Sequence, residues 1–464
     1  MNNSWQRLKI SEVCELIVDC VNKTAPTVDY PTPFKMLRTP NIKNGVVDTG
    51  NCKYVTSETF DKWTRRAKIQ PQDVLLTREA PLGEVGIVKN SSENLFLGQR
   101  IMQYRANKNI LDPAYLLYSF LSKDLQDQFR SHEGSGSVVS HIRVPDCSKF
   151  ELFVPPLQEQ RKISKILSDL DDKIHLNNQI NQTLESIAQA IFKSWFVDFE
   201  AVRAKIAAKQ EGIDPELAAM CVISGKSEAE LEQMEKEDFA ELQATAALFP
   251  DELVESELGE VPKGWKVKPL DEIANYLNGL ALQKFRPENE HEFLPIVKIA
   301  QLKSGIATIE EKASPNIDPK FIINNGDVIF SWSGSLMVDI WCGGKAALNQ
   351  HLFKVTSIDY PKWFYCSYTK HHLAEFQRIA QAKAVTMGHI KREHLSQALC
   401  IVPSNQVLDI GNNVIGAQMQ KQIVLRLENN NLIQVRDTLL PKLLSGELDV
   451  SRLASETEYE YSTE

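Results

Sequence analysis

PPLQEQRKISKILSDLDDKIHLNNQINQTLESIAQAIFKSWFVDFE occupies residues 155–200 and decides how the rest of the sequence is interpreted. After Pro155 and Pro156 the apolar residues recur every three or four positions, at 163, 166, 167, 170, 174, 180, 184, 187, 191 and 195. This spacing predicts one long amphipathic helix with a coiled-coil-like seam. Asn177 falls where the seam expects an apolar residue. If it is buried it fixes the helix register, and exposure of its side chain is the alternative.

A weaker form of the same pattern runs from about 418 to 444. There Asn429-Asn430 corresponds to Asn177-Asn178, and the leucines of 439–444 correspond to the apolar pairs of 187–192. A long helix with an apolar stripe must bury that stripe, and within one chain its duplicate is the obvious partner. Two equivalent helices related by a pseudo-two-fold axis are expected to pack antiparallel.

The regions outside these helices are also duplicated. Six short strings of the first half recur in the same order in the second, with offsets that change smoothly, as loop-length differences would produce. They are Trp5 with Trp265, LRTPNIKNG (37–45) with VKIAQLKSG (297–305), DVLLT (73–77) with DVIFS (327–331), LGQR (97–100) with LNQH (348–351), SHIR (140–143) with GHIK (388–391), and FVPP (153–156) with IVPS (401–404). The sequence therefore contains two copies of one domain.

Each copy mixes short strand-like runs with helical segments. The runs at 73–77, 85–88 and 327–331 are rich in β-branched and other apolar residues and are interrupted by Gly, Pro and Asn. Apolar spacing predicts one amphipathic helix at 113–130, repeated at 361–379. The expected fold class is therefore α+β, with two similar mixed-sheet domains of about 150 residues, separated by two long antiparallel coiled-coil helices in a pseudo-two-fold duplication.

The negative charge is confined to one segment. The chain carries a formal net charge of −9, but residues 201–260 contain 15 acidic and 5 basic residues, so everything else is close to neutral. Local basic clusters in the two domains are compatible with DNA binding. We expect 201–260 to be an acidic, partly helical connector, with or without a function of its own, and the acidic end of the chain, 451–464, to be a disordered tail.

The bulk composition indicates a soluble protein of the cytoplasm. The chain has no apolar run of eighteen residues, so no membrane span is expected, and no secretory signal is recognised at its start. Its eight cysteines include no C-x-x-C pair, which is typical of reduced, buried thiols. No metal site is expected, because the possible ligands are not clustered.

Catalytic motifs are missing from the sequence. An adenine methyltransferase needs a short Asn/Asp-Pro-Pro-aromatic string, and Pro155-Pro156 lies between Val154 and Leu157 instead. The GGKA string at 343–346 lacks the first Gly and the Ser/Thr of a phosphate-binding loop. Glu310-Glu311-Lys312 has no nearby upstream Asp that would complete a nuclease site. We therefore predict a non-catalytic recognition subunit.

Four strings give the chain a family resemblance. AQAIFKSWFVDFE at 188–200, SELGEVPKGW at 256–265, PPLQEQ at 155–160 and LLPKLLSGEL at 439–448 resemble the conserved regions of type I restriction–modification specificity subunits, in the same order. The resemblance covers nearly the whole chain. It departs at Arg436, which stands where Leu184 does in the first copy, and at 405–417, which lacks the PLQEQ start.

The resemblance implies both an organisation and partners. It implies a first target-recognition domain (1–155), a central conserved helical spacer (156–200), the acidic connector (201–260), a second target-recognition domain (261–404) and a C-terminal conserved spacer (415–450). Each domain would read half of a bipartite, asymmetric double-stranded DNA target. Two methyltransferase subunits would methylate adenine N6, and motor–nuclease subunits would join to complete the restriction enzyme. S-adenosylmethionine, ATP and magnesium would bind those partners, and this chain would hold no cofactor.

Candidate DNA contacts are polar residues at corresponding positions of the two copies, because Arg, Lys, Asn and Gln read bases while Lys, Arg and Ser bind phosphates. A role in supporting the fold is the alternative for each of them. In the first domain they are Arg38, Asn41, Lys43, Arg78, Gln99, Arg100, Ser137, His141 and Arg143. In the second they are Lys298, Gln301, Lys303, Ser331, Ser333, Gln350, His351, Lys383, Thr386, His389 and Lys391. Positions that differ, such as Arg78 against Trp332, are the better candidates for sequence choice.

The conserved helices also offer candidate subunit contacts. These are Ile187, Ile191, Phe192, Trp195, Phe196, Leu440, Leu443 and Leu444. For Trp195 and Phe196 two interpretations stay open, packing against the sister helix or packing against a methyltransferase helix. A scaffold or decoy subunit that binds methyltransferase without sequence preference is the competing hypothesis for the whole chain.

Overall fold

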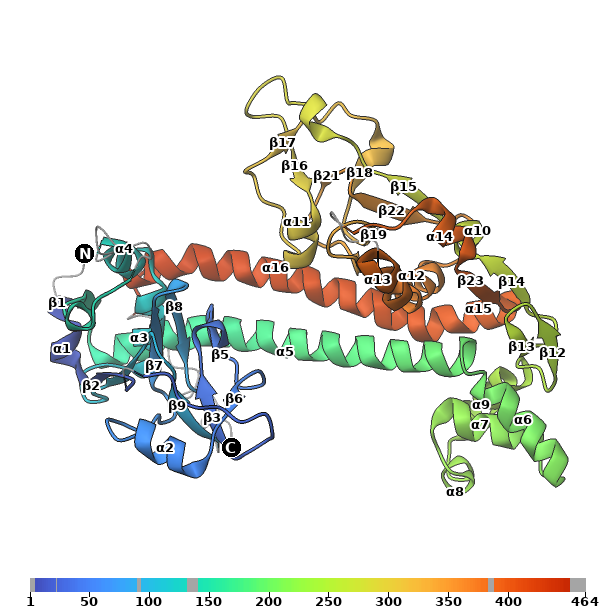
Figure 1. Cartoon of the computed structure of the whole chain (residues 1–464), viewed down its shortest axis with the longest axis horizontal. Coiled ribbons are helices and arrows are strands. Elements are labelled where there is room, and N and C mark those ends of the chain that lie inside the picture. The colour runs from blue at the N-terminus through green and yellow to red at the C-terminus, as the bar shows by residue number, and fades with distance from the viewer. Residues whose placement is uncertain (1–4, 22, 90–92, 132–140, 383–387, 451–464) are drawn as a thin grey trace, which may run out of the picture. The chain divides into compact units, whose positions relative to one another are not determined.

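The computed structural model describes residues 5–21, 23–89, 93–131, 141–382 and 388–450 (Figure 1). The chain divides into two compact units. The first comprises residues 1–174 together with 431–464, and the second comprises 175–430. Each unit therefore contains one sheet-bearing domain and one segment from each of the two long helices. The predicted disordered tail, 451–464, lies outside the described residues.

The first unit is built on a six-stranded sheet. Its strands follow the order β2 (Cys14–Asp19), β10 (Ile101–Ala106), β7 (Val74–Arg78), β8 (Leu82–Ile87), β5 (Gly45–Val47) and β4 (Ile42–Lys43). Five further strands form a three-stranded sheet, β6 (Lys53–Tyr54), β3 (Phe34–Leu37) and β9 (Asn94–Leu97), and a two-stranded sheet, β1 (Gln6–Lys9) and β11 (Glu151–Val154). The helices are α1 (Ile10–Val13), α2 (Ser57–Trp63), α3 (Pro113–Leu121) and α4 (Lys123–Ser131).

The second unit repeats this combination of sheets and helices. One four-stranded sheet has the order β15 (Asn275–Asn278), β22 (Leu352–Thr356), β19 (Val328–Ser331), β20 (Met337–Ile340). The other has the order β17 (Lys312–Ala313), β16 (Leu294–Val297), β21 (Ala346–Leu348), β18 (Ile322–Ile323), and β14 (Lys266–Pro269) pairs with β23 (Leu399–Val402). The helices of this sheet-bearing domain are α10 (Leu270–Ile273), α11 (Ile299–Ser304), α12 (Lys362–His371), α13 (Leu373–Ala382) and α14 (Arg392–Gln397).

The two long helices are α5 (Leu157–Phe196) and α16 (Ala417–Leu444). Within the second unit, Asn177 of α5 contacts Asn429 of α16, and Glu185, further along α5, contacts Gln422, which lies earlier in α16. Residue numbers rise along one helix as they fall along the other, so the helices run antiparallel. The predicted α+β fold, with two sheet-containing domains and long helices, is confirmed.

The seam of this helix pair contains a polar layer. The Asn177 side chain is fully buried and donates through Nδ2 to Asn429 Oδ1 at 2.9 Å and to Glu428 Oε2 at 3.0 Å. Asn429 Nδ2 in turn donates to Asn178 Oδ1 at 2.9 Å. The buried alternative for Asn177 is therefore correct. Because the Asn177 and Asn429 Nδ2 groups reach these acceptors only when the two helices are aligned, the layer favours one register.

In the first unit the ends of the same two helices complete the core of the sheet domain. Ile163 and Leu167 of α5 and Leu443 of α16 pack in one cluster with Tyr104 and Phe120. A domain core thus includes spacer residues, which ties the sheet to the helices by apolar burial.

Arg436, which departs from the pattern of the first copy, is hydrogen-bonded within the first unit. Its guanidinium donates to Asp171 of α5 at 2.8 Å, and the Tyr118 hydroxyl of α3 donates to the same carboxylate at 2.8 Å. The polar side chain that replaces a leucine of the first copy is therefore satisfied by a charged partner.

Three expectations about helices are wrong. The single helix predicted at 113–130 is divided at Ser122, whose extended backbone ends α3 and whose Oγ accepts from the Leu125 N–H of α4 at 3.4 Å. The repeat at 361–379 is similarly divided at His372, between α12 and α13. Ile187, predicted in the seam, is 42% exposed.

The second spacer begins earlier than 415. Helix α15 (Asn405–Gly411) leads through a π-helical turn, η5 (Asn412–Gly416), into α16. A Cβ at Gly411 would lie 2.4 Å from the Trp363 ring, and one at Gly416 would lie 2.8 Å from the Asn412 amide oxygen. Glycines are thus required where the turn passes the buried indole.

Residues 200–262 form a small folded subdomain in the second unit. It contains α6 (Glu200–Glu211), α7 (Pro215–Ser224), α8 (Glu228–Leu231), α9 (Lys236–Ala247) and the hairpin β12 (Leu253–Ser256) and β13 (Gly259–Pro262). Phe249 packs edge-on against Trp195 with ring centroids 5.3 Å apart. The buried Lys205 ammonium donates to Glu216 and to the Phe249 carbonyl, both at 2.9 Å. The connector is therefore packed, not merely a solvated link.

No described helix combines the length and the apolar character that crossing a membrane requires.

We predict that Asn177→Ala lowers the free energy of unfolding by about 1–3 kcal/mol, because it removes the N–H donor from the buried Asn429 Oδ1. The measurement is urea unfolding followed by far-UV circular dichroism. Leu176→Ala is the matched control, since Leu176 is adjacent but 50% exposed, and its change should stay within about 0.5 kcal/mol. Equal effects of the two substitutions would contradict the role of the polar layer.

Candidate nucleic-acid interface

Three sequence-predicted segments of the first domain meet at the end of β7. The Arg78 N–H donates to the Arg100 carbonyl at 2.8 Å, and the Ile142 N–H donates to the Arg78 carbonyl at 3.0 Å. The Thr39 hydroxyl donates to the Ala80 carbonyl at 2.8 Å, so the 37–45 segment lies against the turn that follows the strand. The structure thus gathers Arg38, Arg78, Arg100, His141 and Arg143 around one strand end.

The second domain repeats these backbone hydrogen bonds, and we call the shared arrangement around Arg78 and Trp332 the frame. The Trp332 N–H donates to the His351 carbonyl at 3.4 Å, and the Ile390 N–H donates to the Trp332 carbonyl at 3.0 Å. Ser333 and His389 form an antiparallel bridge beside them. Trp332 therefore occupies the position of Arg78, and His351 that of Arg100, as the alignment of LGQR with LNQH predicts. A shared backbone frame carries different side chains in the two copies.

Guanidinium groups dominate the site of the first domain. Arg78 Nη1 donates to the Ile142 carbonyl at 2.8 Å, and the Arg100 Nε lies 3.4 Å from Glu79 Oε2. Arg143 is exposed and forms no ion pair with the described side chains. Burial raises the pKa of the neighbouring Cys20 thiol, and the positive charge of Arg78 opposes that rise. The site is cationic.

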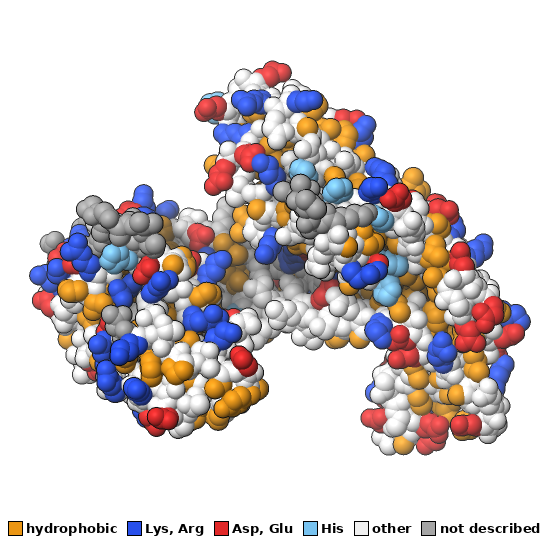
Figure 2. Space-filling view, in the orientation of Figure 1, with side chains coloured by type: hydrophobic (Ala, Val, Ile, Leu, Met, Phe, Trp, Pro, Cys, Tyr) orange, Lys and Arg blue, Asp and Glu red, His pale blue; other side chains and the backbone are white. Residues whose placement is uncertain are grey.

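Neutral and aromatic groups dominate the site of the second domain. Ser333 Oγ and His351 Nδ1 are hydrogen-bonded at 3.0 Å, and Trp332 Nε1 donates to Asn278 Oδ1 at 2.9 Å. The Trp332 ring lies 6.0 Å from the His351 ring and 6.2 Å from the His389 ring. Figure 2 shows lysine and arginine side chains on the visible faces of both domains, with several histidines on that of the second.

Several candidates support the fold. The Asn41 amide oxygen accepts from the Arg38 N–H at 2.9 Å, and the Gln301 amide oxygen accepts from the Lys298 N–H at 3.3 Å. Each amide closes the first turn of a short helix at the same place in its domain. Ser331 is fully buried and donates to the Ser333 carbonyl at 3.1 Å. Their recurrence in both copies therefore has a structural cause.

The other candidates lie mainly on the surface. Lys43, Gln99, Lys303, His389 and Lys391 are exposed, and Gln350 is half-buried beside His351. The Lys298 ammonium forms an ion pair with Glu311, and that of Lys391 lies 3.3 Å from Glu393. Ser137, Lys383 and Thr386 lie outside the described residues.

Sequence reasoning missed Glu79 and Asn278. Glu79 directly follows Arg78 in the chain, and its position two residues past the predicted strand end at Thr77 was a usable signal. Asn278 lies at the end of β15, and no motif marks it. Its proximity to Trp332 depends on strand pairing between distant segments, which local sequence does not show.

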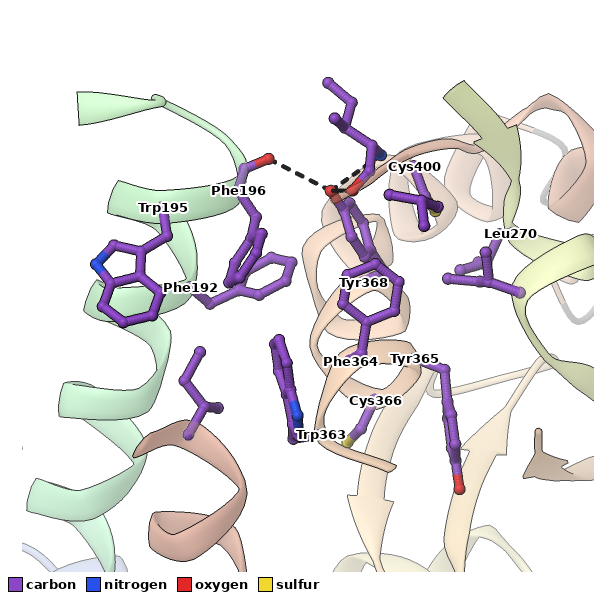
Figure 3. Packing of buried hydrophobic residues seen from close by; sticks show 14 of the residues in the cluster. Phe192, Trp195, Phe196, Leu270, Trp363, Phe364, Tyr365, Cys366, Tyr368 and Cys400 are labelled. Carbon is purple, nitrogen blue, oxygen red and sulfur yellow. Dashed lines mark hydrogen bonds between the residues drawn. The ribbon is translucent and has the colours of Figure 1, made fainter. Parts of the chain in front are cut away.

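Of the eight candidate subunit contacts, several pack within this chain. Phe192 and Phe196 point toward Tyr368 and Trp363 of α12 (Figure 3), with ring centroids 4.9 Å apart for Phe192–Tyr368 and 5.4 Å for Phe196–Trp363. Trp195 is 3% exposed. These aromatics join α5 to the second domain and to the connector, and Met419 and Ile423 of α16 belong to the same buried cluster.

The remaining candidate contacts differ in exposure. Leu443 is buried, Ile191, Leu440 and Leu444 are half-buried, and Ile187 is exposed. Among the described residues, no group of three or more His, Cys, Asp or Glu side chains is arranged to hold a metal ion.

A duplicated α+β domain on a pair of long helices is the architecture that known proteins share with this chain. A family model described as the type I restriction modification DNA specificity domain matches residues 2–186 and 262–435. The fold is similar to that of the crystal structure of the type I restriction-modification S subunit from M. genitalium, with a TM-score of 0.50 and 15% identity over 96% of this chain and 97% of that one. At that identity the likeness concerns the fold alone.

Relatives extend over most of the chain. It is 30% identical over 400 residues to the type I restriction enzyme HindI specificity subunit of Haemophilus influenzae, which covers 82% of this chain and 87% of that protein. It is 26% identical over 394 residues to the MjaIX specificity subunit of Methanocaldococcus jannaschii, covering 82% and 78%. The chain belongs to the type I restriction-modification DNA specificity family, and the resemblance found in the sequence is confirmed.

We predict that Asn41→Ala destabilises the first domain by about 1–2 kcal/mol, because the Arg38 N–H loses the buried Asn41 amide oxygen as its acceptor. Lys43→Ala, two residues on and exposed, should change stability by less than about 0.5 kcal/mol. Urea unfolding of the two variants measures the difference. If Asn41→Ala weakened DNA binding at unchanged stability, Asn41 would be a contact and not a structural cap.

Proposed function

We propose that this chain is the DNA sequence-specificity subunit of a type I restriction–modification complex. Its two domains read the halves of a bipartite, asymmetric target, and partner subunits methylate adenine N6 or cleave. The observation that carries this proposal is the shared frame at the ends of β7 and β19. Equivalent backbone positions present Arg78 and Arg100 in one domain and Trp332 and His351 in the other. Two readers with one docking geometry and different side chains suit two different half-sites.

The chain itself performs recognition and no chemistry in this proposal. S-adenosylmethionine, ATP and magnesium act on the methyltransferase and motor–nuclease subunits, and the complex works in the cytoplasm. The division of charge supports a DNA-reading role, because the acidity lies in 201–260 and not in the two domains. Cationic side chains can then attract phosphates locally.

Exposed apolar residues on the helices offer a docking face for the methyltransferase subunits. Leu176 and Ile187 of α5 are 50% and 42% exposed, and Val424 of α16 is 48% exposed. Leu176 and Ile187 are eleven residues apart, which places them on nearly the same side of an α-helix. Exposed leucine and isoleucine on one side of a helix are typical of a protein-binding surface.

We predict that co-expression with the modification subunits produces adenine methylation at a split, asymmetric motif. Replacing residues 1–155 by the first domain of another family member should change one half of that motif and leave the other half unaltered. Long-read methylome sequencing measures both. A continuous palindrome, a change in both halves, or binding of methyltransferase without sequence preference would contradict two independent readers; the last outcome favours the scaffold or decoy hypothesis.

We predict that Ile187→Asp weakens association with the methyltransferase subunit at least about tenfold, because a carboxylate would be placed in an apolar interface. Gln182→Glu is the matched control, since it adds the same charge on another side of the helix. Co-purification and titration calorimetry give the two affinities, and circular dichroism checks that both variants fold. Equal losses would show that charge, not the apolar face, is responsible.

A further inference from the structure

Three candidate side chains of the first domain are already hydrogen-bonded within its own fold. Arg78 Nη1 donates to the Ile142 carbonyl, and the Asn41 amide oxygen accepts a backbone N–H. The Gln99 amide oxygen accepts from the Thr24 hydroxyl at 3.2 Å. Each of these bonds restrains the side chain that makes it and limits its reach toward a base edge. Arg100 and Arg143 are the guanidinium groups that the frame leaves facing solvent.

The backbone directs the Arg100 side chain outward. Arg100 has φ +74°, in the left-handed region that side-chain-bearing residues seldom adopt. Its carbonyl is held by the Arg78 N–H at 2.8 Å, and its side chain is 51% exposed. This backbone conformation sets the direction in which the Arg100 side chain leaves the main chain. His351, at the equivalent place, is not among the described non-glycine residues with a positive φ.

Glu79 determines which ligand suits Arg100. The Glu79 carboxylate lies 3.4 Å from Nε, so the two terminal nitrogens stay available as a pair of parallel donors. Such a pair matches O6 and N7 of guanine in the major groove. A phosphate is a poorer ligand, because its negative charge would approach the carboxylate that already accompanies Arg100. A neutral base edge meets no such repulsion.

Arg143 has the opposite setting. It is exposed, it follows the Ile142 that is hydrogen-bonded into the frame, and no described carboxylate pairs with it. An unaccompanied guanidinium attracts the DNA backbone whatever the sequence. Two arginines near one strand end therefore have different electrostatic surroundings, and these assign them different ligands.

We propose that the half-site read by the first domain contains a guanine, which Arg100 reads through O6 and N7, while Arg143 binds a nearby phosphate. The proposal rests on the proposed function as a DNA-specificity subunit and adds to it one base and one residue. Glu79 is then a positioning residue, which orients Arg100 and disfavours phosphate at that point.

The test compares methylomes of the complete complex carrying the wild-type chain, Arg100→Gly, Arg100→Lys or His351→Ala. Arg100→Gly removes the side chain and suits the left-handed backbone, so it is the least disruptive deletion. Arg100→Lys keeps the charge and loses the paired donors. Both should relax one guanine position of one half-site, lowering discrimination there by about 5- to 150-fold, the equivalent of 1–3 kcal/mol. His351→Ala should leave that half-site unchanged.

A binding titration at several salt concentrations tests Arg143. Arg143→Ala should weaken binding to all sequences alike and reduce the magnitude of the logarithmic salt slope by about one. Arg143→Lys should restore that slope without any change in the motif. A sequence-dependent loss in Arg143→Ala would overturn the assignment of phosphate to Arg143.

The outcomes separate this inference from the proposed function. If the wild-type complex methylates no split motif, the proposed function itself fails. If it methylates one in which neither half contains guanine, or if both Arg100 variants keep the wild-type guanine requirement, the inference is overturned and the proposed function stands. If Arg100→Gly is inactive, Arg100→Lys decides: relaxation at a guanine supports base reading, and an unaltered motif overturns it.

Discussion

Burial of the apolar stripe of α5 against α16 is the constraint on which the rest of the structure depends. A helix of 40 residues with such a stripe has most of its stability from packing rather than from intrinsic helix propensity. The same two helices enter the cores of both units, through Ile163 and Leu443 in one and Phe192 and Phe196 in the other. Each sheet-bearing domain is therefore packed against helices that also pack against each other.

The polar layer at Asn177 gives that apolar contact a register. Leucine and isoleucine pack with almost equal energy when one helix slides past the other, whereas a buried amide loses its partner. Asn177 bonds to Glu428 and Asn429, and Asn429 bonds back to α5. A small cost in desolvation thus specifies one alignment of the helix pair.

Because the domain is duplicated, the two copies share the backbone hydrogen bonds of the frame, whereas the side chains at its positions differ. The backbone hydrogen bonds at Arg78 and Trp332 are equivalent, and they do not depend on side-chain type. Substitution there changes the chemistry presented to a ligand while the strand end keeps its geometry. The cationic site of one domain and the histidine, serine and tryptophan site of the other are the result.

The duplication, the long helices, the α+β class and the family could be predicted from the sequence, because they depend on periodicity and on strings of adjacent residues. The sequence also identified the chain segments that the structure brings together at the candidate site. Only the tertiary structure decided that Asn41 and Gln301 cap short helices, that Asn177 is buried, and that the predicted helix at 113–130 is divided at Ser122. Each of these depends on a partner or a backbone angle that local sequence does not specify. The placement of Glu79 beside Arg100 is of the same kind, because strand pairing brings the two segments together.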